Sequence, residues 1–327
     1  MNWRRLARIF IRYILPVAVI VLVGWHFFNI LRKPELRDVT YAFRVEWLIP
    51  AGLLYALAHT IWASFGWSLL HDQGFPATYG TGVRAYFISQ LGKYVPGKVW
   101  VIVIRMTMLG ASPKDKAIVG LAATYDALIS MGAGAMVGAI LIAALHIDLQ
   151  MLKLVVGHEY ILIGVALVPI GLGLLQRMSV RIARRKRGHD AVPIQMMNMP
   201  LLLRGLVQDS IGWMFLGVSL WMTVQAIHPN PAAFTIEDWL RLTAINAVAY
   251  IIGFVTFFMP GGAGAREYVL AMLLAGELAL MGLASPVAMG LSVVVALVLR
   301  LTWTSAELLM IAVLYRFVPT RITKPPG

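Results

Sequence analysis

The sequence predicts an all-α polytopic membrane protein, and three observations carry that prediction. Of its 327 residues, 60% are hydrophobic and only 13% are charged, whereas soluble domains carry roughly 25% charged residues. The mean hydropathy is +0.78. Several apolar runs reach the length of about 20 residues that a helix needs to cross a bilayer. We therefore expect about six full transmembrane helices and two broken-helix hairpins that turn back within the membrane.

Six apolar segments are candidate full spans. They cover residues 13–31, 48–70, 117–145, 158–176, 206–227 and 287–315. We interpret the first as a retained span, because no small-residue cleavage site follows it. Two more apolar regions, 83–109 and 240–280, are interrupted by proline and glycine.

Positive charge orients these spans, because cytoplasmic loops collect Lys and Arg. The basic N-terminus and the basic run 177–187 are both expected inside, so an even number of crossings separates them. Region 83–109 then makes no net crossing. The acidic linker 228–241 is expected outside and the basic C-terminus inside. Region 240–280 is re-entrant in this scheme, and the alternative of two full helices there gives the same orientation of the C-terminus.

The two interruptions divide the chain into an inverted repeat. We expect a basic segment, first helix and linker in 1–47, a first membrane repeat in 48–176, a basic loop in 177–205, a second membrane repeat in 206–316 and a tail in 317–327. Pro96 and Pro260 are about half the chain apart. Matching interrupted segments in two halves point to the midplane site of a transporter, although Pro and Gly are also common in ordinary membrane helices.

The interruptions read "LGKYVPGKVW" and "FFMPGGAGAREYVL". Proline cannot continue a helix without freeing a carbonyl group, and glycine accepts turn geometry. Free backbone groups at membrane depth are tolerated only against protein or a water-filled cavity. The N-termini of half-helices favour anionic groups such as phosphate. The breaks therefore predict a cavity that receives an anion.

Charged side chains in the apolar regions are candidate site residues, because one charge at the bilayer centre costs on the order of 2.5–3.5 kcal/mol. Explanations that involve no ligand also stay open. Lys98 and Arg105 could snorkel to the interface, Asp126 could neutralise a lysine, and Arg300 and Glu307 could form a structural ion network. Arg266 and Glu267 are sequence neighbours that point in different directions on a helix, so each needs its own partner or ligand.

Composition excludes several classes of chemistry. There are no cysteines, so disulfides and thiolate-bound metals are excluded. The seven histidines show no metal-ligand spacing, and no nucleophile elbow or phosphate-binding loop is present. We expect no metal, no cofactor and no catalytic residues. The net charge of +13 fits membrane topology and anionic lipid better than nucleic acid.

The two motifs together resemble those of the lysylphosphatidylglycerol synthase transmembrane-region family, which includes the flippase domain of the multiple peptide resistance factor. The matching stretches are Gly92 through Lys98 and Pro260 through Glu267. The resemblance implies lipid handling, the two-hairpin inverted repeat and a bacterial plasma (inner) membrane, with both termini cytoplasmic. Because "RITKPPG" is not followed by a soluble synthase domain, we expect a stand-alone member without lysyl transfer.

The function expected from these observations is a flippase or transporter for an anionic phospholipid or a polyprenyl-linked lipid. The alternatives are a membrane-embedded transferase for a lipid-linked substrate and a scaffold for a separately encoded lipid-modifying enzyme. The expected head-group residues are Lys93, Tyr94, Pro96, Gly97, Lys98, Arg105, Pro260, Gly261, Gly262, Arg266 and Glu267. Those expected to balance charge or couple ions are Asp126, Arg300 and Glu307.

Overall fold

The computed structural model describes most of the membrane-embedded sequence. The described residues are 43–95, 99–110, 112–147, 199–229, 234–255, 262 and 264–318, together with parts of 21–32 and residue 174. The expected spans 13–31 and 158–176 lie largely outside them, and the basic run 177–187 lies wholly outside. The site predictions that fall outside the described residues are Pro96, Gly97, Lys98, Pro260 and Gly261.

Every regular element in these described ranges is a helix. The helices are α3 (Val45–Asp72), α4 (Tyr79–Ser89), the short 3-10 helix η3 (Gln90–Tyr94), α5 (Val99–Leu109), α6 (Pro113–Ala144), α9 (Met199–Ile227), α10 (Ile236–Val255), α11 (Ala265–Leu280) and α12 (Ser285–Phe317). The predicted all-helical class is confirmed.

Five of these helices are long and apolar enough to cross a membrane: α3, α6, α9, α10 and α12. Four coincide with the expected spans 48–70, 117–145, 206–227 and 287–315, of which only 117–145 extends one residue past its helix. The fifth, α10, comes from the interrupted region 240–280 and has 20 residues, or about 30 Å of helix. The total of six spans and the re-entrant course of the hairpins stay predictions.

Each interrupted region folds into helical arms that pack against each other. In the first, α4 contacts α5, and α5 also packs on α6; in the second, α10 contacts α11. The arms α4 and α5 have 11 residues each, or about 16 Å, which is short of the roughly 30 Å hydrocarbon core. By length, neither α4 nor α5 crosses a bilayer alone.

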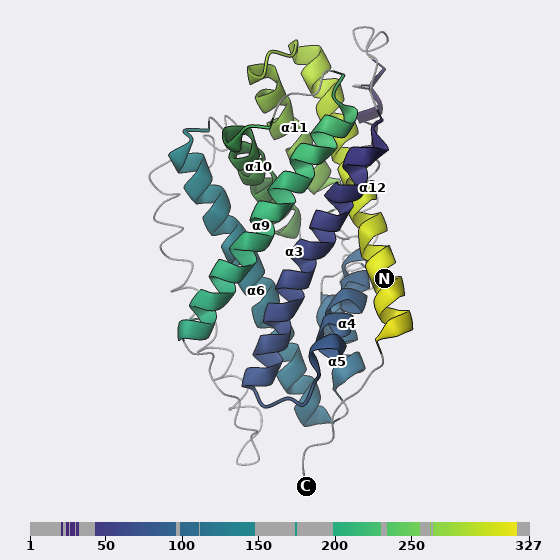
Figure 1. Ribbon diagram of the computed structural model, residues 1–327, viewed down its shortest axis with the longest axis vertical. Helices are drawn as coiled ribbons and strands as arrows, with labels where there is room; N and C mark the ends of the chain where they lie inside the picture. Colours follow the sequence, from purple (N-terminus) through teal and green to yellow (C-terminus); the bar gives the residue numbers. More distant parts are fainter. Residues whose placement is uncertain are drawn as a thin grey trace, which may run out of the picture. The chain divides into compact units, whose positions relative to one another are not determined.

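The chain divides into two compact units, and each holds one hairpin. Unit 1 comprises Met1–Ala56, Lys93–Lys98 and Met214–Glu307, and unit 2 comprises Leu57–Gly92, Val99–Trp213 and Leu308–Gly327. Figure 1 shows α3 beside α9, and hydrogen bonds join these helices in both units. In unit 1 the Ser219 hydroxyl donates to the Ala51 carbonyl (2.8 Å). In unit 2 the Trp62 indole donates to the Asp209 carbonyl (3.0 Å).

Candidate functional site

The second interruption in unit 1 ends in a glycine turn that starts α11. Gly262 and Gly264 have φ values of 68° and 87°, which L side chains rarely adopt. A Cβ atom at position 262 would also lie 2.8 Å from the Gly253 carbonyl oxygen of α10. The Gly264 amide donates to Glu267 Oε2 (2.7 Å), so that Glu267 caps one free amide at the start of α11. The glycines of "PGGAGARE" thus bring this turn close against α10.

Arg266, in the first turn of α11, points into unit 1. Its side chain is buried, with 7% of the residue exposed. The guanidinium carbon lies 4.8 Å from the ring centre of Tyr250 and 4.6 Å from that of Trp303, which are cation–π distances. The buried Nε atom has no hydrogen-bond partner, and Arg266 makes no ion pair within the described part of the chain. Its charge is stabilised by aromatic faces, and its donor groups are not used up by a carboxylate.

The Trp303 ring under Arg266 is fixed by a chain of hydrogen bonds. Its indole donates to the Ser219 hydroxyl (2.8 Å), which in turn donates to the Ala51 carbonyl (2.8 Å). Trp303 also stacks on Tyr55, with 5.0 Å between ring centres. A buried tryptophan with a satisfied N–H is well ordered, so the guanidinium rests on a rigid platform.

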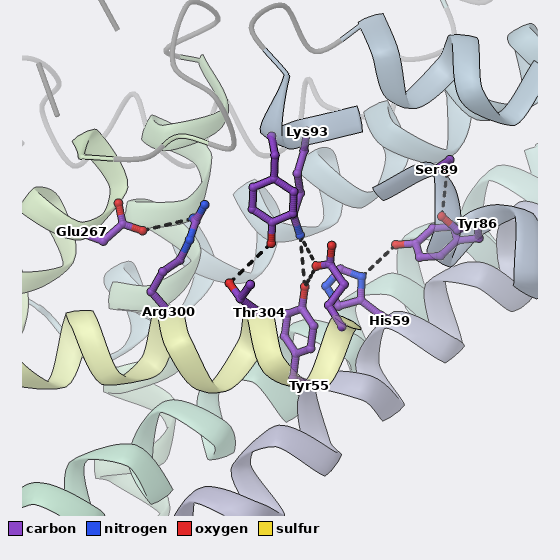
Figure 2. A network of polar contacts seen from close by, with 10 residues as sticks. Tyr55, His59, Tyr86, Ser89, Lys93, Glu267, Arg300 and Thr304 are labelled. Carbon is purple, nitrogen blue, oxygen red and sulfur yellow. Dashed lines mark hydrogen bonds and ion pairs between the residues drawn. The ribbon is translucent and has the colours of Figure 1, made fainter. Parts of the chain in front are cut away.

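Glu267 and Arg300 link the hairpin to α12 (Figure 2). Arg300 Nη1 lies 3.2 Å from Glu267 Oε1. The other carboxylate oxygen of Glu267 accepts from the Gly264 amide. The Arg300 guanidinium carbon lies 5.8 Å from the Tyr94 ring centre. Glu267 therefore has a structural partner on each oxygen, whereas Arg300 is shared between a carboxylate and an aromatic ring.

Lys93 and Tyr94 of η3 contact α12 on the turns that follow Arg300. Lys93 forms an ion pair with Glu307 and lies 3.3 Å from the Tyr55 hydroxyl, as Figure 2 shows. The Tyr55 hydroxyl donates to the same Glu307 oxygen (2.7 Å). Tyr94 donates to the Thr304 hydroxyl (3.4 Å). The first motif is thereby tied to α12 within unit 1.

These side chains form what we call the unit 1 charge cluster, consisting of Lys93, Arg266, Glu267, Arg300 and Glu307. It combines three cations with two carboxylates, and both carboxylates are engaged by Lys93, Arg300 or backbone amides. The surplus positive charge lies in a buried setting, where electrostatic interactions are stronger than in water. Such an arrangement favours an anionic ligand.

Unit 2 contains a separate buried ion pair. Arg105 Nη1 of α5 lies 2.7 Å from Asp126 Oδ2 of α6. Arg105 Nε donates to the Ser89 hydroxyl (3.2 Å), and the guanidinium carbon lies 4.8 Å from the Tyr86 ring centre. Tyr86 also contacts His59 Nδ1 (3.1 Å; Figure 2). Arg105 is thus buried among polar partners of unit 2 and does not snorkel, and Asp126 neutralises an arginine where a lysine was the sequence-based alternative.

The predicted site residues that the structure describes are divided between the two units. Those in unit 1 are Lys93, Tyr94, Gly262, Arg266, Glu267, Arg300 and Glu307, and those in unit 2 are Arg105 and Asp126. In both units an ion pair joins the second hairpin arm to the following long helix: Arg105–Asp126 in one and Glu267–Arg300 in the other. The inverted repeat itself stays a prediction.

Sequence reasoning missed the aromatic residues around Arg266 and one buried acid. Tyr55, Tyr250 and Trp303 resemble ordinary apolar-span residues, and nothing in their spacing signals a cation platform. Asp209 is different, since it is the one acid in the apolar helix Met199–Ile227. A single carboxyl group in such a helix was a detectable signal.

Long apolar helices with buried ion pairs define a polytopic helical membrane protein with a polar interior. The chain belongs to the family described as lysylphosphatidylglycerol synthase TM region, whose model matches residues 13–299. This confirms the resemblance seen in the two motifs and supports a membrane lipid-related role. No curated protein matches the chain.

Gly253 provides a test of the close contact that places Arg266. A Cβ atom at position 253 would lie 2.7 Å from the Arg266 Cβ atom, so Gly253→Ala is expected to push α10 and α11 apart. Overpacking of this kind costs about 1–3 kcal/mol, and thermal unfolding in detergent should detect it. Gly276→Ala on α11 is the matched control, because a Cβ atom there meets nothing within 4 Å. Equal stability of the two variants would contradict the close contact.

Proposed function

We propose that the protein moves a lipid with an anionic head group between the leaflets of a bacterial inner membrane. The observation that carries this proposal is Arg266, whose buried guanidinium group rests between two aromatic rings and has an Nε atom without a partner. A buried polar group without a partner costs free energy, and a bound anion removes that cost. Membership of the lysylphosphatidylglycerol synthase TM region family supports a lipid as the source of the anion.

Arginine suits this role because its planar fork of N–H groups binds phosphate oxygens in pairs. Lys93 and Arg300 add charge to the same cluster, while Glu307 and Glu267 hold them in place. In this mechanism the head group enters the unit 1 charge cluster and the acyl chains stay in the hydrocarbon. Rearrangement of the two hairpins against their long helices then carries the head group across, as in transporters built from inverted repeats.

The proposal also includes the residues predicted to bind the head group at the two helix breaks. Tyr94, Pro96, Gly97 and Lys98 belong to the first break, and Pro260, Gly261 and Gly262 belong to the second. Half-helix N-termini at these breaks favour phosphate. In the proposed membrane orientation, both chain termini face the cytoplasm. A polyprenyl-linked phosphate and a phospholipid present the same anionic chemistry to the cluster.

The proposal is tested by reconstituting purified protein in liposomes that carry a trace of fluorescent lipid. Dithionite bleaches only the outer leaflet, so lipid exchange raises the bleached fraction. We expect faster exchange of phosphatidylglycerol and polyprenyl-phosphate probes than of a phosphatidylcholine probe, because only the first two are anionic. Equal rates for all probes would contradict head-group recognition, and no exchange would contradict lipid movement. Appearance of a covalently altered lipid would favour the transferase alternative.

A further inference from the structure

Asp209 is a carboxylic acid buried in unit 2 without a partner. It lies within α9 and has 0% of its surface exposed. Neither carboxyl oxygen has a hydrogen-bond partner among the residues that the structure describes. Placing an ionised carboxylate in such surroundings without compensation costs several kcal/mol at least. In practice a group in this position gains a proton instead.

Asp209 lies near α3 and near a second acid, Asp126. Trp62 of α3 donates to the Asp209 carbonyl, and Gly66, one turn further along α3, faces Asp126, whose carboxylate would lie 3.2 Å from a Cβ atom there. Asp209 lies within electrostatic range of Asp126. Thus one face of α3 meets both acids.

Asp126 already has a cationic partner. Arg105 is paired with Asp126 at 2.7 Å and also contacts Ser89 and Tyr86. An ionised Asp209 would therefore add a second negative charge near a pair that is neutral as it stands. The other titratable side chains that are buried on the described helices of unit 2 are His59, Tyr86 and Tyr125. No group of three or more potential metal ligands occurs within the described ranges.

We propose that Asp209 is a proton-binding site that is occupied near neutral pH in this conformation. The proton resides on one carboxyl oxygen, so that an uncharged Asp209 lies near the Arg105–Asp126 ion pair. A rearrangement that brings water or a cation to Asp209 releases the proton. If unit 2 rearranges during the lipid movement proposed above, proton binding at Asp209 biases that movement, because a ligand shifts an equilibrium between states that bind it differently.

Infrared spectroscopy tests the proton site without any lipid readout. Purified protein near neutral pH should show the carbonyl stretch of a protonated carboxylic acid, and Asp209→Asn should lose it. Asn has the shape of a neutral Asp, so this variant is expected to fold. Asp209→Leu is a second variant, in which an apolar side chain replaces the acid. Glu237→Gln is the control, because Glu237 is an exposed carboxylate on α10, with 62% of its side chain accessible, and should not contribute to the band.

Loss of the band in both Asp209 variants but not in Glu237→Gln is the expected result. An unchanged band in either folded variant would overturn the assignment to Asp209, as would the absence of any such band in the wild-type protein. These outcomes do not depend on lipid exchange. Failure of the proton site is thereby distinguished from failure of the proposed function, which the liposome experiment decides.

Discussion

Arg266→Ala is expected to slow lipid exchange in liposomes by roughly 10- to 100-fold, since a hydrogen bond to a charged group is worth about 1.5–3 kcal/mol. The guanidinium group lies over Tyr250 and Trp303 and has a buried Nε atom without a partner. Alanine removes the donors that an anionic head group would use. It leaves the two rings and the ion pairs of the unit 1 charge cluster in place. The rate is measured by dithionite bleaching at equal protein density.

Two further variants separate charge from geometry. Arg266→Lys keeps the positive charge but loses the planar stacking and the paired donors of arginine, so its exchange rate should fall between wild type and alanine. Arg241→Ala is the matched control. It removes an arginine from the same hairpin, but one that already pairs with Glu237 at 2.9 Å. An equal loss in Arg241→Ala would mean that any hairpin arginine supports the rate, and a wild-type rate in folded Arg266→Ala would remove Arg266 from the mechanism.

The helices could be predicted because they depend on local sequence. Runs of apolar residues of bilayer length indicated α3, α6, α9 and α12, and no long-range contact was needed to find them. The short arms α4 and α5 also follow from local signals, since "YVPGK" lies between them. The division into two units could not be predicted, because α3 and α9 each contribute to both. Nothing in the sequence of a continuous helix marks the residue at which it passes from one unit to the other.

The candidate site was partly predictable for a similar reason. A charge in an apolar helix is visible in the sequence, so Arg105, Asp126, Arg300 and Glu307 were identified. Their partners were not, because the pairs Arg105–Asp126 and Glu267–Arg300 depend on how helices pack. The same is true of Trp303, whose role under Arg266 depends on hydrogen bonds to Ser219. Only the tertiary structure turns an ordinary aromatic residue into a cation platform.

Breaking the Lys93–Glu307 pair is expected to have the largest effect on stability. Glu307 is nearly inaccessible, with 1% of its side chain exposed, while Lys93 retains 18%. Removing one partner of a buried pair costs about 3–5 kcal/mol, because the other charge is left uncompensated. Lys93→Met should therefore lower the free energy of unfolding more than Glu307→Gln does, since Lys93 can reach water and Glu307 cannot. Chemical or thermal unfolding in detergent measures both.

The double variant Lys93→Met/Glu307→Gln closes a thermodynamic cycle. Both charges are then gone, and glutamine can still accept from the Tyr55 hydroxyl, so most of the lost stability should return. The reference is the value typical of surface ion pairs, about 0.2–1 kcal/mol. An interaction energy between Lys93 and Glu307 no larger than that reference would contradict a buried pair.

Lipid exchange by the double variant then decides what Lys93 does. If Lys93 only holds η3 against α12, restoring stability restores exchange as well. If Lys93 also contacts the anionic head group, the double variant regains most of the lost stability and is still slow, because methionine offers no charge. Stability and transport are separated in this way by a protein that folds. The second outcome would place the first motif, and not Arg266 alone, in the lipid pathway.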